Sequence, residues 1–526
     1  MSTEIAIQKE SVSEHSTSKR WLTFPAAIGF LLFLVVFFNS TKGKITEPDI
    51  WWHLRNADHI ISTHSFPRFD QYSFTASGTP WIDHEWLSEL AYLVAFRIFG
   101  LRGMFVLFAT LAAAIFVLLY HRCRHAGANP KTASIIMALG ILVASVSFGP
   151  RALLFGWLCM SALLFILERF SATRSAPLWV LPPLFCLWIN LHGSWLFGVI
   201  VLATFIASGL IKGEWGRVSA EPFSAAELKK LTTVAALAIA ALFVNPFGYR
   251  LVGYPLDLMF RQQTNIRNIE EWQSVDFHDP RGKLAMLLLL TIFASVLGSR
   301  RRFSAYETLI GAFALYTSLT YWRMQFFAAL IFVPLISARL PLFPPYDVRK
   351  EKPLLNGTIM LGVIALLVLQ FPSEATLHRQ IADEYPEGAL TFMHDKHITN
   401  RVLNHYSWGG YMIWHTPDIK VFIDGRADIY AYTGILDDYI KLYRLQDTLK
   451  ILDRYRLQYV LYPPNTPLAY LLRNSSCWQQ IYGDNVAVLY QRDSQQAGCN
   501  LPAATVGSTS RPVKTMPSKA FPQNPS

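Results

Sequence analysis

Long apolar runs alternate with shorter polar segments over the first 371 residues of the chain. A helix needs about 20 mainly apolar residues to cross the hydrocarbon core of a bilayer, and most of these runs approach that length. The pattern therefore predicts an all-α polytopic membrane protein with about eleven transmembrane helices. The predicted spans are residues 20–38, 102–120, 132–148, 152–168, 177–189, 194–211, 231–245, 283–298, 305–320, 324–338 and 354–371.

The charged residues change this picture by giving the spans a direction. The net charge is +11, which raises the question of a nucleic-acid partner. One set of alternate loops, however, carries 19 basic and 9 acidic residues, whereas the other has a net charge of −1. Such an asymmetry is a topology signal, so we expect no nucleic-acid partner. The low charged fraction of 16% and the hydrophobic fraction of 52% exclude a soluble enzyme and a disordered chain.

The basic loops predict the orientation in the cytoplasmic (inner) membrane. By the positive-inside rule, residues 1–19 form a cytoplasmic N-terminal tail, and an odd number of spans leaves the C-terminal region extracytoplasmic. No small-residue cleavage pattern follows the first span, so we expect an uncleaved anchor. The membrane part, residues 20–371, contains a long first outer loop, 39–85, and a long second one, 245–282.

Two segments near the first outer loop have helical character. Asp49–Thr63 has apolar residues at helical spacing and predicts a helix along the membrane surface. Trp86–Phe99 is apolar but short and predicts a re-entrant or interfacial helix before the second span.

The composition after residue 371 predicts a small extracytoplasmic α/β domain over 372–492. Val421–Ile423, Tyr459–Tyr462 and Ala487–Tyr490 have strand character, and Leu436–Tyr455 has helical period. Residues 493–526 are rich in Ser, Pro, Thr and Gln and predict a disordered tail. Pairing of Cys477 with Cys499 in this compartment stays open.

The first outer loop concentrates acids, histidines and tryptophans. It reads Glu47-Pro48-Asp49-Ile50-Trp51-Trp52-His53 and, further on, Pro80-Trp81-Ile82-Asp83-His84-Glu85-Trp86. Charged groups at the lipid boundary are costly unless they are paired, ligated or in a wet cavity. We take Asp49, His84 and Glu85 as catalytic candidates, with Glu47 and Asp49 as the alternative ligands of Mg²⁺ or Mn²⁺. The competing interpretation is that of interfacial aromatics and solvated loop charges.

Other outer loops supply candidate substrate-binding residues. Guanidinium groups at span ends suit a phosphate or pyrophosphate, although they also snorkel to lipid headgroups. His192, in a tight turn, suits a substrate hydroxyl, although such a histidine can instead satisfy a helix end. Glu271, beside Trp272, suits a sugar hydroxyl, although it can equally lie in a solvated loop turn. The candidates are His53, Arg151, His192, Arg250, Glu271 and Arg323.

Two motifs stand out in the C-terminal domain. The glycines of Trp408-Gly409-Gly410-Tyr411 suggest tight turns. For Asp424-Gly425-Arg426-Ala427-Asp428 we favour a structural ion-pair cluster, with glycan or acceptor docking as the functional alternative.

Pro48-Asp49-Ile50-Trp51-Trp52-His53-Leu54 and His84-Glu85-Trp86-Leu87 closely resemble the motifs of a poorly characterised bacterial multi-pass family. Over residues 20–492, the architecture resembles the GT-C superfamily of membrane glycosyltransferases, which includes protein O-mannosyltransferases and the aminoarabinose transferase. Glu47-Pro48-Asp49 matches the place of the superfamily's first-loop acidic motif, with Glu-x-Asp where many members have adjacent acids or Asp-x-Asp. The Trp-Trp-Asp sequence of oligosaccharyltransferases is absent from 372–492.

The resemblance implies transfer of a sugar from a polyprenyl-phosphate-linked donor to a glycan, lipid or protein acceptor at the outer membrane face. It gives Asp49 the role of base or metal ligand, and it makes membrane lipid a partner. The rival hypothesis is a non-catalytic glycolipid transporter or a membrane assembly factor, because apolar spans serve either task.

Overall fold

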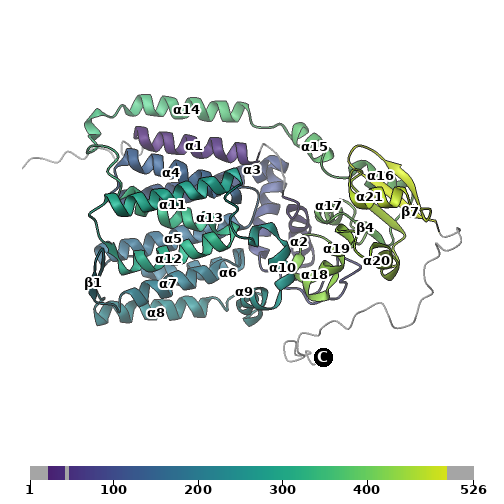
Figure 1. Ribbon diagram of the computed structural model, residues 1–526, viewed down its shortest axis with the longest axis horizontal. Helices are drawn as coiled ribbons and strands as arrows, with labels where there is room; N and C mark the ends of the chain where they lie inside the picture. The colour runs from purple at the N-terminus through teal and green to yellow at the C-terminus, as the bar shows by residue number, and fades with distance from the viewer. Residues whose placement is uncertain (1–21, 42–46, 494–526) are drawn as a thin grey trace, which may run out of the picture.

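The protein is elongated, with a helical bundle at one end and a C-terminal part that contains a sheet at the other (Figure 1). The computed structural model describes residues 22–41 and 47–493. The predicted tail 1–19, Cys499 and nearly all of the predicted tail 493–526 lie outside the described residues.

The described residues up to 371 form helices joined by loops, some of which contain short strands. The helices are α1 (Phe24–Thr41), α2 (Ile50–Thr63), α3 (Trp86–His125), α4 (Pro130–Ala144), α5 (Leu153–Thr173), α6 (Leu181–Leu191), α7 (Trp195–Ser208), α8 (Ala225–Ala241), α9 (Tyr249–Arg261), α10 (Gln263–Asn268), α11 (Pro280–Gly298), α12 (Ala305–Thr320), α13 (Gln325–Ser337) and α14 (Pro353–Leu369).

A helix overlaps each predicted span, but few are long enough to cross a bilayer alone. Three described helices, α3, α5 and α11, are long and apolar enough. A fourth candidate is α14 together with α15 (Glu374–Ala382), which is bent by 52° from it. Others, such as α6 with 11 residues and α7 with 14, are apolar but shorter than the usual 20. The number of eleven crossings therefore stays a prediction.

The segment 86–99, predicted as a re-entrant or interfacial helix, is helical and joins the following span as α3, with a break between them. Phe99 and Gly100 leave helical geometry, and Gly100 has a φ of +61°, which glycine adopts at little cost. The carboxylate of Glu374 accepts the backbone N–H of Leu101 at 2.8 Å. Glu374 thus caps the second half of α3, and the first half is free to lie beside α2.

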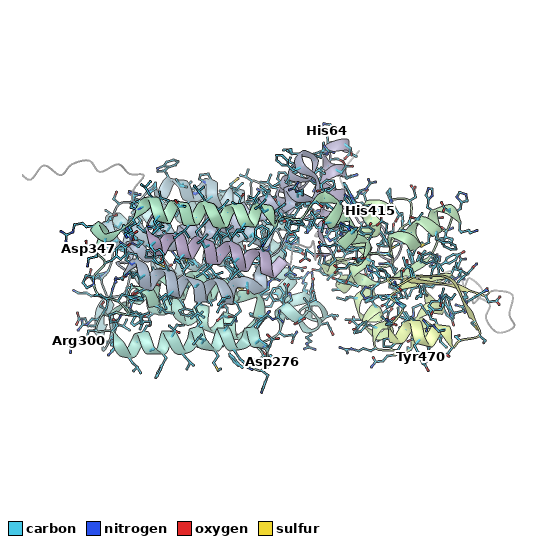
Figure 2. The ribbon with its side chains drawn as sticks, turned by 90° about the horizontal axis from the view of Figure 1, so that it is seen from above. His64, Asp276, Arg300, Asp347, His415 and Tyr470 are labelled. Carbon is cyan, nitrogen blue, oxygen red and sulfur yellow. The ribbon has the colours of Figure 1, made fainter. Side chains whose placement is uncertain are left out.

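Loops that the charge pattern places on one side of the membrane contact one another at the end of the bundle away from the C-terminal part. There, β1 (Gly213–Trp215), β2 (Val218–Ala220) and β3 (Phe303–Ser304) form a small sheet. Arg301 donates to the carbonyl of Ala126 at 2.7 Å, and Arg302 pairs with Glu214 at 2.5 Å. Figure 2 shows Arg300 and Asp347 at this end and Tyr470 at the opposite end.

The C-terminal part is a small α/β unit. A four-stranded sheet has the order β4-β5-β7-β6, in which β4 and β5 are parallel and the other neighbours antiparallel. Its strands are β4 (Val402–Asn404), β5 (Tyr459–Tyr462), β6 (Trp478–Gly483) and β7 (Val488–Arg492). Its helices after α15 are α16 (Glu387–Asp395), α17 (Gly409–His415), α18 (Ala427–Thr433), α19 (Ile435–Tyr443), α20 (Thr448–Arg454) and α21 (Pro467–Arg473).

Local structure here corrects two of the sequence expectations. The expected strand Val421–Ile423 is not a strand of this sheet. The backbone N–H of Phe422 donates to the side-chain oxygen of Asn404 at 2.8 Å, and Val421 forms an isolated β-bridge with Ser73 of the first loop. The expected helix Leu436–Tyr455 is two helices, α19 and α20, separated at residues 444–447, where Leu445 and Asp447 have positive φ. Tyr459–Tyr462 is confirmed as a strand.

The glycines of the 408–411 motif allow close packing instead of a tight turn. Gly409 begins α17, and a Cβ at Gly410 would lie 2.6 Å from the carbonyl oxygen of Pro48. Trp51 of α2 packs edge-on against Tyr411 at 5.2 Å between ring centroids. The C-terminal part therefore closes directly onto the start of α2.

Candidate functional site

A cavity of about 790 Å³ lies where the bundle, the first loop and the C-terminal part meet. The structure gathers on its wall all but one of the site residues proposed from the sequence. These are Glu47, Asp49, His53, His84, Glu85, Arg151, His192, Glu271 and Arg323. Arg250, on the first turn of α9, is not among the lining residues.

Asp49 is held at the N-terminal end of α2, against the C-terminal part. It is half-buried and precedes Ile50, the first helical residue. Its carboxyl group lies over Gly425, where a Cβ would be 2.5 Å from Asp49 Cγ. Burial, and then the neighbouring Glu47 carboxylate, raise the pKa of Asp49 to about 7. Asp49 is thus poised to accept a proton near neutral pH.

Glu85 lies among three histidines from different parts of the chain. Its carboxyl oxygens are 3.6 Å from His53 Nε2, 3.6 Å from His84 Nε2 and 3.4 Å from His192 Nε2. Burial lowers the pKa of both His53 and His84 to about 3, so both rings are neutral at pH 7. Burial, and then Glu89 and Asp83, raise the pKa of Glu85 well above its usual range. The surroundings of Glu85 therefore favour its protonated form, which can donate a hydrogen bond.

The turn between α6 and α7 fixes the tautomer of His192. The backbone N–H of Ser194 donates to His192 Nδ1 at 3.0 Å, so the ring proton lies on Nε2, facing Glu85. A Cβ at Gly156 of α5 would lie 3.1 Å from His192 Nδ1, so this glycine gives the ring its space.

Behind this cluster, a buried polar network fixes the helix faces, and the sequence analysis missed it. His53 Nδ1 lies 2.8 Å from Glu89, and the Asn56 amide donates to Asp83 at 2.7 Å and to Glu89 at 2.6 Å. Asn56 and Glu89 are fully buried. The sequence marks these two residues only as polar positions on otherwise apolar helix faces, Asn56 on α2 and Glu89 on α3.

Two arginines face the carboxylates from short turns at the end of the bundle. Arg151 forms ion pairs with both Glu47 and Glu271, and so joins the two long outer loops. The guanidinium of Arg323 lies 4.4 Å from the ring centroid of Trp272. Among the described residues, Arg323 forms no ion pair, so its charge remains available to an anion in the cavity.

The C-terminal part contributes Asp428, whose contact with the bundle the sequence did not reveal. Tyr254 of α9 donates to Asp428 at 3.0 Å, and its ring stacks on His84 at 4.6 Å between centroids. Burial raises the pKa of Asp428 to about 6. Asp428 therefore belongs to the cavity wall rather than to the ion-pair cluster expected for residues 424–428.

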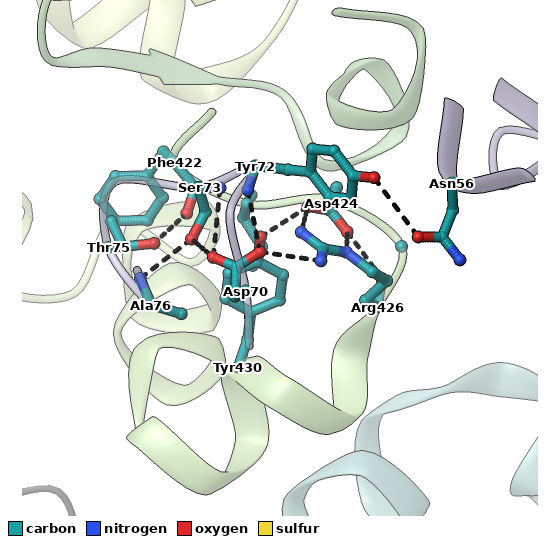
Figure 3. Close-up of polar contacts among 12 residues, drawn as sticks. Asn56, Asp70, Tyr72, Ser73, Thr75, Ala76, Phe422, Asp424, Arg426 and Tyr430 are labelled. Atoms are coloured by element: carbon teal, nitrogen blue, oxygen red, sulfur yellow. Dashed lines mark hydrogen bonds and ion pairs between the residues drawn. The ribbon is translucent and has the colours of Figure 1, made fainter. Parts of the chain in front are cut away.

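The rest of that motif is a structural ion-pair cluster, as favoured from the sequence. Arg426 pairs with Asp424 at 2.7 Å and with Asp70 of the first loop at 2.8 Å, and all three are buried (Figure 3). Tyr430 donates to Asp424 at 2.6 Å. The cluster fastens the C-terminal part to the first loop, next to Asp49.

The predicted Mg²⁺ or Mn²⁺ site stays a prediction. Glu47 is engaged by Arg151, which leaves Asp49 as the second carboxylate of the pair. Within residues 22–41 and 47–493, no group of three or more His, Cys, Asp or Glu side chains is arranged to hold a metal ion.

No protein-family model and no curated protein matches the chain. Solved structures similar to it include an Archaeoglobus fulgidus oligosaccharyltransferase tethered to an acceptor peptide, 13% identical, with a TM-score of 0.48 over 82% of this chain and 68% of that one. ArnT from Cupriavidus metallidurans, bound to undecaprenyl phosphate, is 12% identical, with a TM-score of 0.45 over 88% and 97%. The arabinofuranosyltransferase AftD from Mycobacteria is 14% identical, with a TM-score of 0.49 over 91% and 40%.

Likeness of this degree assigns no residue, donor or acceptor to the present chain.

Proposed function

We propose that the protein is a membrane glycosyltransferase that moves a sugar from a polyprenyl-phosphate-linked donor to an acceptor hydroxyl at the outer face of the cytoplasmic membrane. The observation that carries the proposal is one cavity with a carboxylate of pKa about 7, Asp49, and a guanidinium without an ion pair among the described residues, Arg323. A base and an anion-stabilising cation are what transfer from a sugar phosphate requires.

The reaction follows from this arrangement. Asp49 takes the proton of the acceptor hydroxyl, and the acceptor oxygen forms a bond to the anomeric carbon of the donor sugar. The bond between that carbon and the phosphate oxygen breaks, and its electron pair stays on the phosphate. Arg323, with Arg151 beside it, stabilises the departing phosphate, while Glu85 and its histidines hold sugar hydroxyls.

The position of α9 supports a lipid-linked donor. Tyr254 and Leu258 line the cavity, whereas Leu256, Met259 and Phe260 of the same helix are exposed. An amphipathic helix of this kind suits the membrane interface, with its apolar side in the acyl region. The cavity is thereby adjacent to the layer in which a polyprenyl chain is dissolved.

A second hollow bears on the transporter hypothesis. It has a volume of about 320 Å³, is lined by Arg122, Glu168 and Tyr306 among others, and shares no lining residue with the first. A transporter needs a path between the two membrane sides, whereas a transferase needs one site on one side.

The test is mass spectrometry of lipid-linked sugars and outer-surface glycans in cells that carry the wild type, a deletion or Asp49→Asn at equal abundance. Asp49→Asn should reproduce the deletion, with one glycosylated product lost and its carrier-linked donor accumulated. Asp58→Asn, at a half-buried position of the same helix and outside the cavity lining, is the matched control. A deletion phenotype that Asp49→Asn does not share would support transport or assembly instead.

A further inference from the structure

The hollow of about 320 Å³ lies at the end of the bundle away from the C-terminal part, where Figure 2 shows Arg300. Its walls come from α3, α5, α12 and α13 and from the loop between α11 and α12. Leu164 and Ile310 are buried lining residues, whereas His125, Arg301 and Arg302 are exposed ones. The hollow therefore combines an apolar floor with a basic rim.

The two acids among the described lining residues are each paired with a buried arginine. Arg122, 1% exposed, donates to the carboxylate of Glu168 through two N–H groups, at 2.9 Å and 2.6 Å. Arg339, outside the lining, pairs with Glu307 at 2.7 Å, and the backbone N–H of Ser304 donates to the same carboxylate at 2.8 Å. The negative charge of both acids is thus compensated within the protein.

The rim keeps an excess of positive charge. Arg301 forms no ion pair within the described part of the chain, and it donates to the carbonyl of Ala126 at 2.7 Å, which holds its guanidinium at the rim. Arg302 pairs with Glu214, but the two side chains are 48% and 67% exposed, so water weakens this pair. Each guanidinium carries five N–H groups and can bind a further anion.

The remaining polar groups of the rim suit the oxygens of a phosphate. Ser171 and Ser219 supply hydroxyl groups there, and His125 supplies an imidazole. Basic pockets between helices on the cytoplasmic side of a membrane are typical sites for anionic lipid headgroups. The charge pattern predicts this end of the bundle to be the cytoplasmic one, because its loops carry the excess of basic residues.

We propose that this hollow binds a phosphate group through Arg301 and Arg302. The apolar floor, which takes the carbon atoms next to the phosphate, favours the headgroup of an anionic phospholipid over free phosphate as its source. A lipid bound in this way bridges the loop after α3 and the loop before α12 and stabilises this end of the bundle. The inference is independent of the proposed function, because the hollow shares no lining residue with the cavity at Asp49.

The test measures binding of defined lipids to the full-length protein in maltoside micelles. Native mass spectrometry titrates phosphatidylglycerol onto the protein, with zwitterionic phosphatidylcholine of the same acyl chains for comparison. The wild type should bind phosphatidylglycerol more tightly. Arg301→Gln should weaken this binding about fivefold, the contribution of one arginine near an anionic surface, and Arg301→Lys, which keeps the charge, should weaken it less. Arg300→Gln, at the neighbouring exposed position outside the lining, is the matched control and should bind like the wild type.

Inorganic phosphate is the soluble probe, and the thermal unfolding temperature reports its binding. Phosphate that stabilises the wild type but not Arg301→Gln, without any Arg301-dependent lipid binding, would overturn the phospholipid and assign the site to a soluble phosphate compound. Equal binding of the two lipids, or equal losses in Arg300→Gln and Arg301→Gln, would overturn the site. None of these results bears on the Asp49→Asn experiment, so the two proposals fail separately.

Discussion

Replacement of Gly425 by alanine tests whether the position of Asp49 controls the reaction. A methyl carbon at residue 425 would lie 2.5 Å from Asp49 Cγ and 3.1 Å from Oδ2, whereas ordinary van der Waals contact begins near 3.4 Å. Asp49 Oδ1 would lie nearer still, so the carboxyl group must retreat by about 2 Å. A 1 Å misplacement of a reacting group costs on the order of 100-fold in rate, so kcat should fall by at least about that factor.

The assay follows release of polyprenyl phosphate from the lipid-linked donor identified in the cellular experiment. Gly253→Ala is the matched control, because Gly253 lies on α9 beside the cavity and a Cβ there would have no heavy atom within 4 Å. The thermal unfolding temperature checks that Gly425→Ala remains folded. Since both changes act on one group, Gly425→Ala should add little to the defect of Asp49→Asn. Activity of folded Gly425→Ala within about twofold of the wild type would refute the placement argument.

Three further predictions concern charge. Because burial and then Glu47 raise the pKa of Asp49 to about 7, and only the ionised carboxylate accepts a proton, the rate should fall about tenfold per pH unit below 7 and level off above it. Glu47→Gln removes a negative neighbour and should move this limb to lower pH, as a pH–rate profile would show; an unmoved limb would assign it to another group. Arg426→Met leaves Asp70 and Asp424 buried without their cation and should cost about 3–5 kcal/mol of stability, visible as a lower unfolding temperature.

The sequence predicted the helices well because their apolar runs are continuous and span-like. A helix overlaps every predicted span, and α2 begins one residue after Asp49, at the start of the predicted segment 49–63. Local composition predicted strands less well. Val421–Ile423 has residues of high strand propensity, yet its backbone groups pair with Asn404 and with the first loop instead of with a strand of the sheet. The composition of three residues does not reveal these distant partners.

Much of the candidate site could be predicted from the types of residue in the loops and from the membrane side that the charge pattern predicts for each loop. Carboxylates, histidines and arginines in alternate loops share one side, so nine of the candidates meet in one cavity. Which members converge depends on tertiary packing. Arg151 and Arg323 reach the cavity and Arg250 does not, although all three occupy similar sequence contexts. The contact of Tyr254 with Asp428 spans 174 residues and has no local signal.

The buried ion pair between Asp70 and Arg426 sets an order of events during synthesis. About 350 residues separate the two partners, and at 5–20 residues per second a ribosome needs about 20 to 70 s to bridge that interval. Until then, the first loop holds a carboxylate without its cation, and the wall around Gly425 that faces Asp49 does not exist. A nascent chain thus enters the membrane with Asp49 uncovered, and only the finished polypeptide closes the cavity around it.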